Sequence, residues 1–249
     1  MIDLSGRSAL VSGGSRGVGA ATALLLARAG ADVAITCRNR KADAESVAGH
    51  IRALGRRAIV SVGEASDAAA ARETVAAVRD GFGKLDILVA NAGTWPATET
   101  PLREMAPARW RDTLTTNLDG VFVLVRAALQ LMEDGAIVLV SSTAGQRGEA
   151  MHADYAAAKG ALISLTKSLA VECAPRITVN CVAPGWIDTE MASSALAGAA
   201  RERVARSIPL GRIAAADDVA GPIAFLCSPL ARHITGEIVN VNGGSVLCG

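Results

Sequence analysis

Tyr155 and Lys159 are the two residues whose types and spacing most directly suggest chemistry. Tyr155 is the only tyrosine of the chain. Lys159 follows it by one helical repeat, so that a helix would place both side chains on one face. A nearby ammonium group favours the phenolate, and we therefore expect the pKa of Tyr155 to lie below its usual value of about 10. The pair could exchange a proton with a substrate; an exposed Tyr/Lys pair on a helix surface is the alternative interpretation.

Ser142 is the third residue that could join this chemistry. It follows the apolar run 136–140, which has the character of a buried strand. The carboxyl ends of parallel strands face the ligand side of a sheet, which would bring Ser142 toward Tyr155. A turn serine that satisfies nearby backbone groups is the alternative interpretation.

A glycine-rich turn, Ser12–Gly19, lies between the first apolar run and the first helical stretch. Its spacing is Gly-x-x-x-Gly-x-Gly, through Gly13, Gly17 and Gly19. Glycines allow a tight turn and let backbone N–H groups approach a pyrophosphate at a helix N-terminus. The turn therefore predicts a dinucleotide cofactor, and a glycine turn without a ligand is the alternative.

The end of the second predicted strand bears on which dinucleotide binds. A carboxylate there would bind the adenosine ribose 2′-hydroxyl of NAD, whereas a basic residue suits the 2′-phosphate of NADP. Here the chain has Cys37 followed by Arg38, and Arg16 stands in the glycine turn. Guanidinium groups bind phosphate in a bidentate manner, which favours NADP. Surface arginines with no ligand are the alternative.

The elements that must position these residues alternate along the chain. Short, continuous apolar runs are typical of strands covered on both faces; they are Ser8–Ser12, Val33–Thr36, Ala58–Val62, Leu85–Ala90, Ala136–Val140, Ile177–Val182 and Ile238–Val241. Stretches of helical period separate them; they are Gly17–Ala29, Lys41–Leu54, Asp67–Gly81, one long helix within Ala108–Met132, Ala153–Cys173 and Asp217–Cys227. Asp67 and Gly30 are expected helix caps.

This pattern predicts an α/β fold consisting of a single doubly wound Rossmann-type domain, residues 1–249, with a mostly parallel seven-stranded sheet. The segment Pro184–Pro209 interrupts the alternation after the sixth predicted strand. Loops of this length are usually functional, so we expect a lid over the site, with a structural helical insertion as the alternative.

Composition excludes several classes of protein. Hydrophobic residues make up 51% of the chain, charged residues 20%, and the formal net charge is +1, which argues against disorder and against an electrostatic nucleic-acid or membrane-surface binder. We expect neither a signal peptide nor a membrane span. The five cysteines, Cys37, Cys173, Cys181, Cys227 and Cys248, form no CxxC pair, which predicts no metal site, no disulfide framework and a cytoplasmic location.

Taken together, the motifs resemble those of the compact short-chain dehydrogenase/reductase family over essentially the whole chain. Besides the glycine turn, Ser142 and the Tyr155/Lys159 pair, the resemblance is carried by Ala90–Gly93, Thr116–Gly120, Ser141–Gly145, Asn180–Gly185 and Thr235–Gly236. The resemblance is strongest to 3-oxoacyl-(acyl-carrier-protein) reductases and their relatives, through 177–180 and 236–244.

The resemblance implies roles for individual residues. Tyr155 would be the proton donor or acceptor, Lys159 would lower its pKa and bind the nicotinamide ribose, Ser142 would hold the substrate oxygen, and Asn117 would anchor a water in the proton relay. Cofactor contacts are implied for Gly13, Ser15, Arg16, Gly17, Val18, Gly19, Arg38, Asn91, Ala92, Gly93, Tyr155, Lys159, Pro184, Gly185, Ile187 and Thr189. Glu64 stands where the family often has Asp-Val against adenine, and the sequence leaves its contact open.

The function expected from this resemblance is NADPH-dependent reduction of a ketone, a 3-oxoacyl thioester or a related small carbonyl compound, to a secondary alcohol. Candidate substrate-pocket residues are Trp95, Gln146, Arg147, Met151, His152, Trp186 and Met191. Glu133 and Asp134, before the fifth predicted strand, argue against docking of an acidic carrier protein. A homotetramer is expected from the family. An alcohol dehydrogenase working in the oxidative direction, a non-catalytic NADP-binding scaffold, and a nucleotide-sugar epimerase or dehydratase remain alternatives.

Overall fold

A seven-stranded parallel sheet forms the centre of the computed structural model, which describes residues 2–247. The strand order is β3-β2-β1-β4-β5-β6-β7, and every neighbouring pair is parallel. The strands are β1 (Ser8–Val11), β2 (Asp32–Cys37), β3 (Ala58–Val62), β4 (Ile87–Ala90), β5 (Gly135–Val140), β6 (Ile177–Pro184) and β7 (Ile238–Val241). The order reverses between β1 and β4, which is the place where doubly wound sheets bind their ligands.

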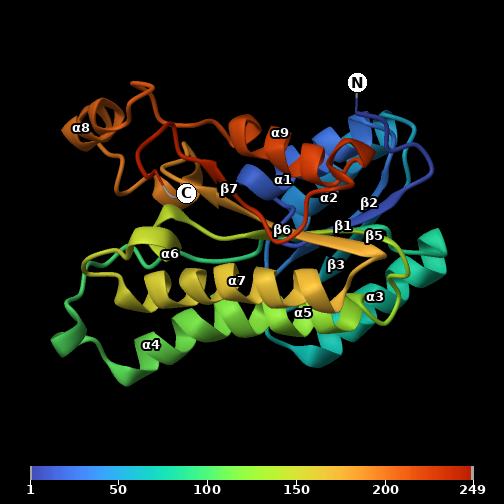
Figure 1. Ribbon diagram of the computed structural model, residues 1–249, viewed down its shortest axis with the longest axis horizontal. Coiled ribbons are helices and arrows are strands. Elements are labelled where there is room, and N and C mark those ends of the chain that lie inside the picture. The colour runs from blue at the N-terminus through green and yellow to red at the C-terminus, as the bar shows by residue number, and fades with distance from the viewer. Residues whose placement is uncertain (1, 248–249) are drawn as a thin grey trace.

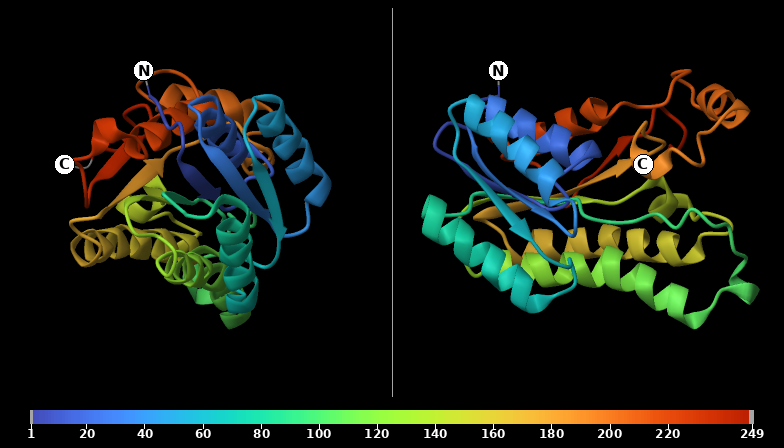
Figure 2. Two further views of the ribbon diagram at one scale, coloured as in Figure 1. Left: turned by 90° about the vertical axis from the view of Figure 1, so that its right-hand side faces the viewer. Right: turned by 180° about the vertical axis from the view of Figure 1, so that it is seen from behind.

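Helices cover both faces of the sheet (Figures 1 and 2). One face carries α1 (Gly17–Arg28), α2 (Lys41–Ala53) and α9 (Ala216–Leu226). The other face carries α3 (Ala68–Phe82), α4 (Pro107–Leu114), α5 (Gly120–Ala128) and α7 (Ala153–Glu172). Each layer encloses its own cluster of buried apolar side chains against the sheet. Burial on both sides explains why the strands are continuously apolar, and the predicted fold class is confirmed.

The predicted helix caps are also found. The Asp67 side chain accepts a hydrogen bond from the backbone N–H of Ala69 at 2.7 Å, which satisfies one of the free donors at the start of α3. Gly30, just beyond α1, has φ +106° and donates its N–H to the carbonyl of Ala27. These local signals place the helix ends where the sequence indicates.

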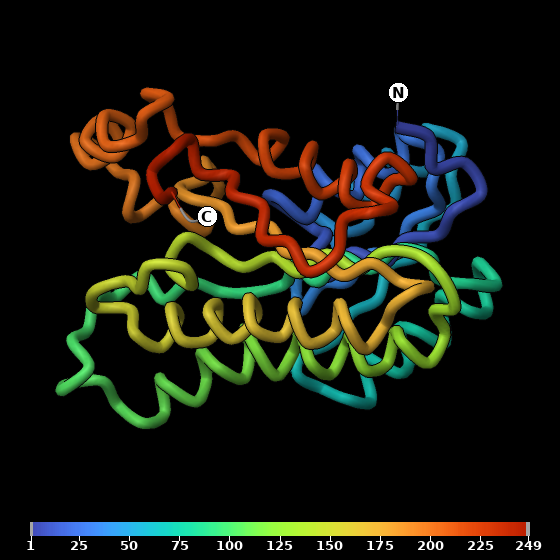
Figure 3. The backbone as a smooth tube through the Cα atoms, in the orientation of Figure 1, coloured from blue at the N-terminus to red at the C-terminus, as the bar shows by residue number. Residues whose placement is uncertain are grey.

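One predicted helix differs from expectation. The long helix expected within Ala108–Met132 is divided, because a π-helical turn, Thr115–Asp119, lies between α4 and α5. The tube in Figure 3 runs through this turn without a change of direction. A π-turn inserts one residue into a helix and is frequent at functional sites.

The segment after β6 contains two elements that the apolar pattern did not reveal. These are a short 3-10 turn, Glu190–Ala192, and α8 (Ala199–Ser207), which has no buried residue. In Figure 1, α8 lies at the end of the molecule toward which β6 points. The action of this segment as a lid stays a prediction.

Four of the five cysteines lie within the described residues, 2–247. Cys37, Cys181 and Cys227 are buried, Cys173 is partly buried, and all four are free thiols; Cys248 lies outside the described residues. Within the described range no group of histidine, cysteine and acidic side chains could hold a metal ion. Nor does that range contain a helix long and apolar enough to cross a membrane.

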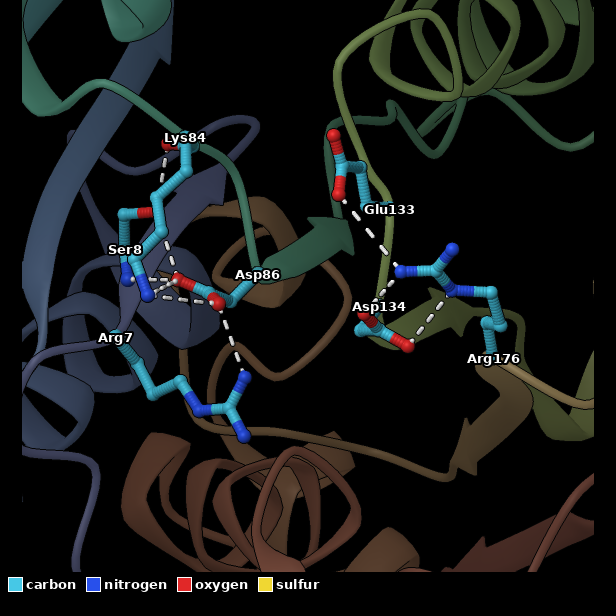
Figure 4. A network of polar contacts seen from close by, with 7 residues as sticks. All are labelled: Arg7, Ser8, Lys84, Asp86, Glu133, Asp134 and Arg176. Atoms are coloured by element: carbon cyan, nitrogen blue, oxygen red, sulfur yellow. Dashed lines mark hydrogen bonds and ion pairs between the residues drawn. The ribbon is translucent and has the colours of Figure 1, made fainter.

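A buried carboxylate, Asp86, ties the amino ends of β1 and β4 together (Figure 4). Its two oxygens accept hydrogen bonds from the Ser8 backbone N–H at 2.8 Å, from the Arg7 guanidinium at 2.9 Å and from the Lys84 ammonium at 3.1 Å. Burial would raise the pKa of Asp86, but these donors outweigh it and hold the pKa below its usual value.

Glu133 and Asp134 lie at the same amino edge, beside Arg176 (Figure 4). Arg176 makes a forked contact with Asp134, at 3.0 and 2.6 Å, and a longer one with Glu133 at 3.7 Å. Arg176 partly neutralises the two acids, which lie at the opposite end of the strands from Ser142. Their effect on the docking of a carrier protein stays a prediction.

We predict that Asp86→Asn lowers the free energy of unfolding by about 1–3 kcal/mol, because a buried network loses its charged acceptor. The exposed Asp80, whose side chain is 69% accessible and pairs only with Arg79, gives the matched control Asp80→Asn, expected to cost less than about 0.5 kcal/mol. Urea unfolding followed by circular dichroism at pH 7 measures both. Since the folded pKa of Asp86 is depressed, the difference from wild type should persist above the unfolded pKa of about 3.9 and narrow as the pH falls through the folded pKa. Equal effects of the two variants would contradict this role.

Candidate active site

A single cleft at the carboxyl ends of the strands collects the residues that the sequence singles out. It is lined by Gly13, Ser15, Arg16, Gly17, Val18, Gly19, Arg38, Asn91, Ala92, Gly93, Asn117, Ser142, Tyr155, Lys159, Pro184, Gly185, Ile187 and Thr189. These residues come from the loops after β1, β2, β4 and β5, from the end of β6 and the loop after it, and from three helical segments: α1, the π-turn and α7. Parallel strand direction is what brings them to one edge.

The glycine turn after β1 is packed too closely for other side chains. A Cβ atom on Gly19 would lie 2.2 Å from the carbonyl oxygen of Gly13 and 2.6 Å from the Asn91 amide nitrogen. Gly13 and Gly17 have φ of +66° and +54°, in the region that favours glycine. The turn leads directly into α1, whose N-cap residue Arg16 makes no side-chain capping bond. A helix start with free donors at a glycine turn suits an anionic pyrophosphate, so the residues present fit a dinucleotide.

Asn91 fastens the end of β4 to this turn. Its amide nitrogen donates to the carbonyl oxygen of Ser12 at 2.9 Å, and the Ser12 hydroxyl accepts the backbone N–H groups of Asn91 and Ala92 at 3.0 and 2.9 Å. These bonds fix the two neighbouring strand ends relative to each other. Asn91 therefore stabilises this part of the cleft independently of any contact with a cofactor.

Three arginines, Arg16, Arg38 and Arg40, lie at the end of the cleft beside β2, where the adenosine of a dinucleotide is expected. Cys37 at the end of β2 is buried, and Arg38 after it faces Glu64 at 3.8 Å. Arg16 and Arg40 both contact the carboxylate of Glu190, which comes from the segment after β6. The sequence indicated Arg16 and Arg38, but it gave no sign that Glu190 would meet Arg16 and Arg40 across the cleft.

Asn117 lies in the π-helical turn and is completely buried. Its amide oxygen accepts the Thr94 N–H at 3.1 Å, while its amide nitrogen donates to the carbonyls of Thr94 and Thr113 at 3.0 and 2.9 Å. The chain approaches closely here, because a Cβ on Gly93 would lie 2.7 Å from the Asn117 oxygen and 3.3 Å from the Lys159 nitrogen. Gly93 thus faces both the Asn117 amide of the π-turn and the Lys159 ammonium group of α7.

The ammonium group of Lys159 is buried, with the residue only 4% exposed. Nζ donates to the carbonyl oxygen of Val140 at 2.9 Å. Burial lowers the pKa of Lys159 to about 8, because the charged form is desolvated. The Ser141 hydroxyl donates a hydrogen bond to the backbone carbonyl of Lys159 at 2.7 Å. Gly145 packs closely against the same carbonyl group, because a Cβ on Gly145 would lie only 2.5 Å from its carbon.

Ser142 and Tyr155 face each other across this part of the cleft. Ser142 is the N-cap of α6 (Thr143–Arg147), where its oxygen accepts the N–H of Ala144 at 3.1 Å. The Ser142 hydroxyl also forms a hydrogen bond with the Tyr155 hydroxyl. Ser141, by contrast, is occupied by the main chain of α7. The geometry therefore brings Ser142 to the phenol and keeps Ser141 away from it.

The pKa of Tyr155 corrects an expectation from the sequence. Burial of the hydroxyl raises the pKa to about 12, and the Ser142 hydrogen bond offsets only part of that increase. The Lys159 ammonium stands 5.7 Å from the centre of the tyrosine ring. Without a cofactor, Tyr155 is therefore a protonated phenol at neutral pH, and its pKa is raised rather than lowered.

A buried ion pair positions the start of α7. Asp154, beside Tyr155 and fully buried, accepts hydrogen bonds from the Arg109 guanidinium and the Thr113 hydroxyl, both at 2.9 Å. Arg109 also donates to the carbonyl of Thr98 at 2.7 Å. This pair joins α4, α7 and the loop after β4, so the loop and the tyrosine are held by the same contacts.

The part of the cleft around Trp95, where a substrate is expected, is aromatic and carries charges of both signs. Trp95 stacks on His152 at 4.7 Å between ring centres and meets Trp186 edge-on at 5.9 Å. Trp95, Trp186, Arg147 and Met191 line the cleft, as the sequence suggests. Glu149 lines it as well, although the sequence analysis did not identify it; burial raises the pKa of its carboxyl group.

Three of the expected pocket residues take other positions. Gln146 donates from Nε2 to Asn240 at 2.6 Å. His152 is buried behind Trp95, where Nε2 donates to the Pro96 carbonyl at 2.8 Å. Met151 has φ +67° and is 43% exposed. None of the three is among the residues that line the cleft.

The segment after β6 closes the remaining side of the cleft. Gly185 donates its N–H to the carbonyl of Val241, and a Cβ there would lie 3.1 Å from the Cβ of Asn242. Ile187 pairs with Ala214, and the methyl group of Thr189 lies 3.4 Å from the position that a Cβ on Gly17 would take. This segment therefore runs from the β6–β7 edge to the glycine turn.

Comparisons with known proteins agree with this architecture. A family model described as enoyl-(acyl carrier protein) reductase matches residues 13–245. The 3-oxoacyl-(acyl-carrier-protein) reductase of Staphylococcus aureus is 40% identical over 242 residues, 96% of this chain and 97% of that protein.

Solved structures match just as completely. A short-chain dehydrogenase of Burkholderia cenocepacia in complex with NADP is 41% identical, with a TM-score of 0.92 over 97% of this chain and 98% of that one. Carveol dehydrogenase of Mycobacterium avium in complex with NAD is 27% identical, with a TM-score of 0.94 over 98% of this chain and 99% of that one.

We predict that the cofactor-free protein shows almost no phenolate absorbance up to pH 10.5, because the pKa of Tyr155 is raised to about 12. The unfolded chain should be half ionised near pH 10. Since this tyrosine is the only one in the chain, ultraviolet difference titration reports it directly, with Tyr155→Phe as the blank and circular dichroism as the check on folding. Half-ionisation of the folded protein at or below pH 10 would contradict the burial argument.

Proposed function

This chain belongs to the short-chain dehydrogenase/reductase family, and on that premise we propose that it is an NADPH-dependent reductase of ketones. As a member of the family it is an oxidoreductase that binds a nicotinamide cofactor. The direction, the phosphorylated cofactor and the catalytic roles given below are our proposals.

The observation that carries the proposal is the polar constellation around Tyr155. A protonated phenol, a serine hydroxyl bonded to it and a buried ammonium group lie in one cleft with a dinucleotide-type glycine turn. A scaffold that only bound a dinucleotide would have no use for a buried ammonium beside a phenol, because burying charge is costly. This argues for catalysis over the non-catalytic alternative.

In the proposed reaction, the bound nicotinamide supplies the hydride for the new C–H bond at the carbonyl carbon. Ser142 holds the carbonyl oxygen by a hydrogen bond. The O–H bond of Tyr155 breaks, its proton passes to that oxygen, and a secondary alcohol results. Lys159 stabilises the phenolate left behind by its positive charge. Asn117 anchors a water in the relay by which the phenol regains a proton.

The relatives support reduction rather than oxidation. Curated proteins near 40% identity over nearly the whole chain are 3-oxoacyl-(acyl-carrier-protein) reductases. A protonated Tyr155 is the form that donates a proton in this direction. We therefore favour the reductive direction over the alcohol dehydrogenase alternative. The epimerase or dehydratase alternative is less favoured, since the relatives and structures that match over nearly the whole chain are named as reductases and dehydrogenases.

The proposed cofactor is NADPH rather than NADH. Three arginines, Arg16, Arg38 and Arg40, surround the end of β2, where the buried Cys37 replaces the carboxylate expected of an NAD site. The Burkholderia cenocepacia structure at 41% identity holds NADP. Positive charge at this position suits a 2′-phosphate.

A 3-oxoacyl thioester or a related small ketone is the proposed substrate. Relatives near 40% identity are 3-oxoacyl-(acyl-carrier-protein) reductases. The substrate end combines the apolar faces of Trp95 and Trp186 with the charged Arg147 and Glu149, which fits an acyl chain bearing polar groups. A carrier protein is a possible donor of this acyl group, but nothing in the charge of the chain requires one.

We also propose a homotetramer, with a dimer as the second choice. Helices α5 and α7 lie side by side on one face of the sheet (Figure 1) and present exposed apolar side chains, with Phe122 at 54% and Val171 at 79% exposure. Large apolar side chains on the outer surface of paired helices are typical of subunit contacts.

We predict that Tyr155→Phe lowers kcat by at least about 100-fold, which is the usual contribution of a positioned proton donor. Binding of NADPH should change less than about threefold, because only one hydroxyl group is removed. Steady-state consumption of NADPH with a panel of 3-oxo thioesters and simple ketones measures kcat, and fluorescence titration measures cofactor binding. Ser168→Ala, on the exposed surface of the same helix, is the control and should behave as wild type. Retained turnover in Tyr155→Phe would sink the proposed mechanism.

A second prediction concerns the carrier. The formal net charge of +1 creates little long-range attraction for an acidic protein, so kcat/KM for a truncated 3-oxoacyl thioester should lie within about tenfold of that for the same group on a carrier protein. The ratio should not depend on salt. A large carrier advantage that disappears at high salt would reveal an electrostatic docking surface.

A further inference from the structure

Glu190 holds together the two arginines at the adenosine end of the cleft. Its Oε2 lies 2.6 Å from Nη1 of Arg16, and its Oε1 contacts Nη2 of Arg40. Both oxygens of one carboxylate are therefore used, each by a different guanidinium group. Arg40 also contacts Asp43 at 3.3 Å on its other nitrogen, which leaves Nη2 directed to Glu190.

The three residues come from different parts of the chain. Arg16 is the last residue before α1, Arg40 is the last residue before α2, and Glu190 begins the short 3-10 turn of the segment after β6. The contact therefore runs across the cleft from the lid segment to the side formed by β1 and β2. Thr189, next to Glu190, lies against Gly17 in the glycine turn.

A dianionic phosphate and this carboxylate would use the same donors. Two guanidinium groups fixed around a pair of acidic oxygens provide the forked geometry that a phosphate group requires. Arg38, the third arginine, faces Glu64 only at 3.8 Å and does not contact Glu190. A 2′-phosphate that takes Nη1 of Arg16 and Nη2 of Arg40 would compete with Glu190 for them.

We propose that Glu190 is a specificity-determining residue for the cofactor, an internal anion that competes with the 2′-phosphate for Arg16 and Arg40. Only a ligand with a phosphate at that position releases the carboxylate, and with it the start of the 3-10 turn. A nucleotide that lacks the phosphate leaves the contact in place. The inference rests on the proposed preference for NADPH. It adds that binding of the 2′-phosphate is coupled to release of the lid segment, Pro184–Pro209, at Glu190.

The expected change in phosphate affinity follows from the solvent exposure of the three side chains. Arg16, Arg40 and Glu190 have side chains that are 46%, 44% and 55% exposed, so both ion pairs are screened by water and salt. Exposed pairs contribute little each, and a competitor of this strength should reduce the affinity for the phosphate roughly threefold to tenfold. The contact is thus weak enough for a dianion to displace.

The test compares two nucleotides that differ by the phosphate alone, adenosine 2′,5′-bisphosphate and 5′-AMP. Isothermal titration calorimetry on the full chain gives both dissociation constants at low and high salt. Glu190→Gln should bind the bisphosphate about three- to tenfold more tightly, most clearly at low salt, and should bind 5′-AMP within twofold of wild type. Glu202→Gln is the matched control, because Glu202 lies in the same segment and pairs only with Arg206 on α8.

Hydrogen exchange supplies a second readout that does not involve activity. The N–H groups of Ala192 and Ser193 donate to the carbonyls of Thr189 and Glu190. In the wild type, exchange at these two amides should change on addition of the bisphosphate and not on addition of 5′-AMP. In Glu190→Gln the two nucleotides should have the same effect.

Three results would overturn the proposal. An unchanged affinity of Glu190→Gln for the bisphosphate would show that the carboxylate does not compete. An equal gain in bisphosphate affinity in Glu202→Gln would show that only the overall charge of the segment matters. Weaker binding of 5′-AMP by Glu190→Gln would show that the carboxylate binds a ribose hydroxyl instead. Failure of the underlying NADPH preference is distinguishable, because wild type and variant would then both bind the two nucleotides equally.

Discussion

The burial of the Lys159 ammonium group is the constraint on which the rest of the site depends. A charged group at 4% exposure is stable only if the protein supplies partners in place of water. The Val140 carbonyl provides one at 2.9 Å. Gly93 has no Cβ, so the chain after β4 can pass close to both the Lys159 ammonium group and the Asn117 amide. The end of β5 and the glycine after β4 are thus arranged around this one atom.

Other features of the fold follow from the same constraint. Ser141 and Gly145 hold α6 against the backbone of Lys159, and α6 in turn presents Ser142 to Tyr155. The buried pair of Arg109 and Asp154 fixes the beginning of α7 one residue before the tyrosine. Desolvation then separates the two titrating groups, with Lys159 lowered to about 8 and Tyr155 raised to about 12. The site thereby combines a protonated phenol with a buried ammonium group, which is the combination that the proposed carbonyl reduction requires.

Much of this could be predicted from the sequence, because the signals are local. Continuous apolar runs indicated all seven strands, Asp67 indicated a cap that the structure contains, and parallel strand direction predicts that Ser142 and Tyr155 meet at one edge. The resemblance to a family then connected the separate motifs. Fold class and family are confirmed, while the roles of individual residues stay proposals.

What could not be predicted depends on long-range packing. The π-turn at Asn117 adds one residue without disturbing the apolar period, and the five-residue α6 is too short to show a period. The pKa of Tyr155 follows from burial by other elements, so its neighbour at Lys159 gave the wrong direction. Glu149 and Glu190 meet the cleft only because of the path taken by loops, and spacing along the chain carries no sign of it.

The most direct test of this account is the pKa of Lys159 itself. The chain has only four lysines, Lys41, Lys84, Lys159 and Lys167, so the protein labelled with carbon-13 at the lysine ε-carbon gives four resonances whose titration can be followed by NMR. The account predicts that the resonance absent in Lys159→Met titrates near pH 8. Titration of that resonance at about 10.4, the value of an unperturbed lysine, would show that the ammonium is not desolvated and would contradict the account.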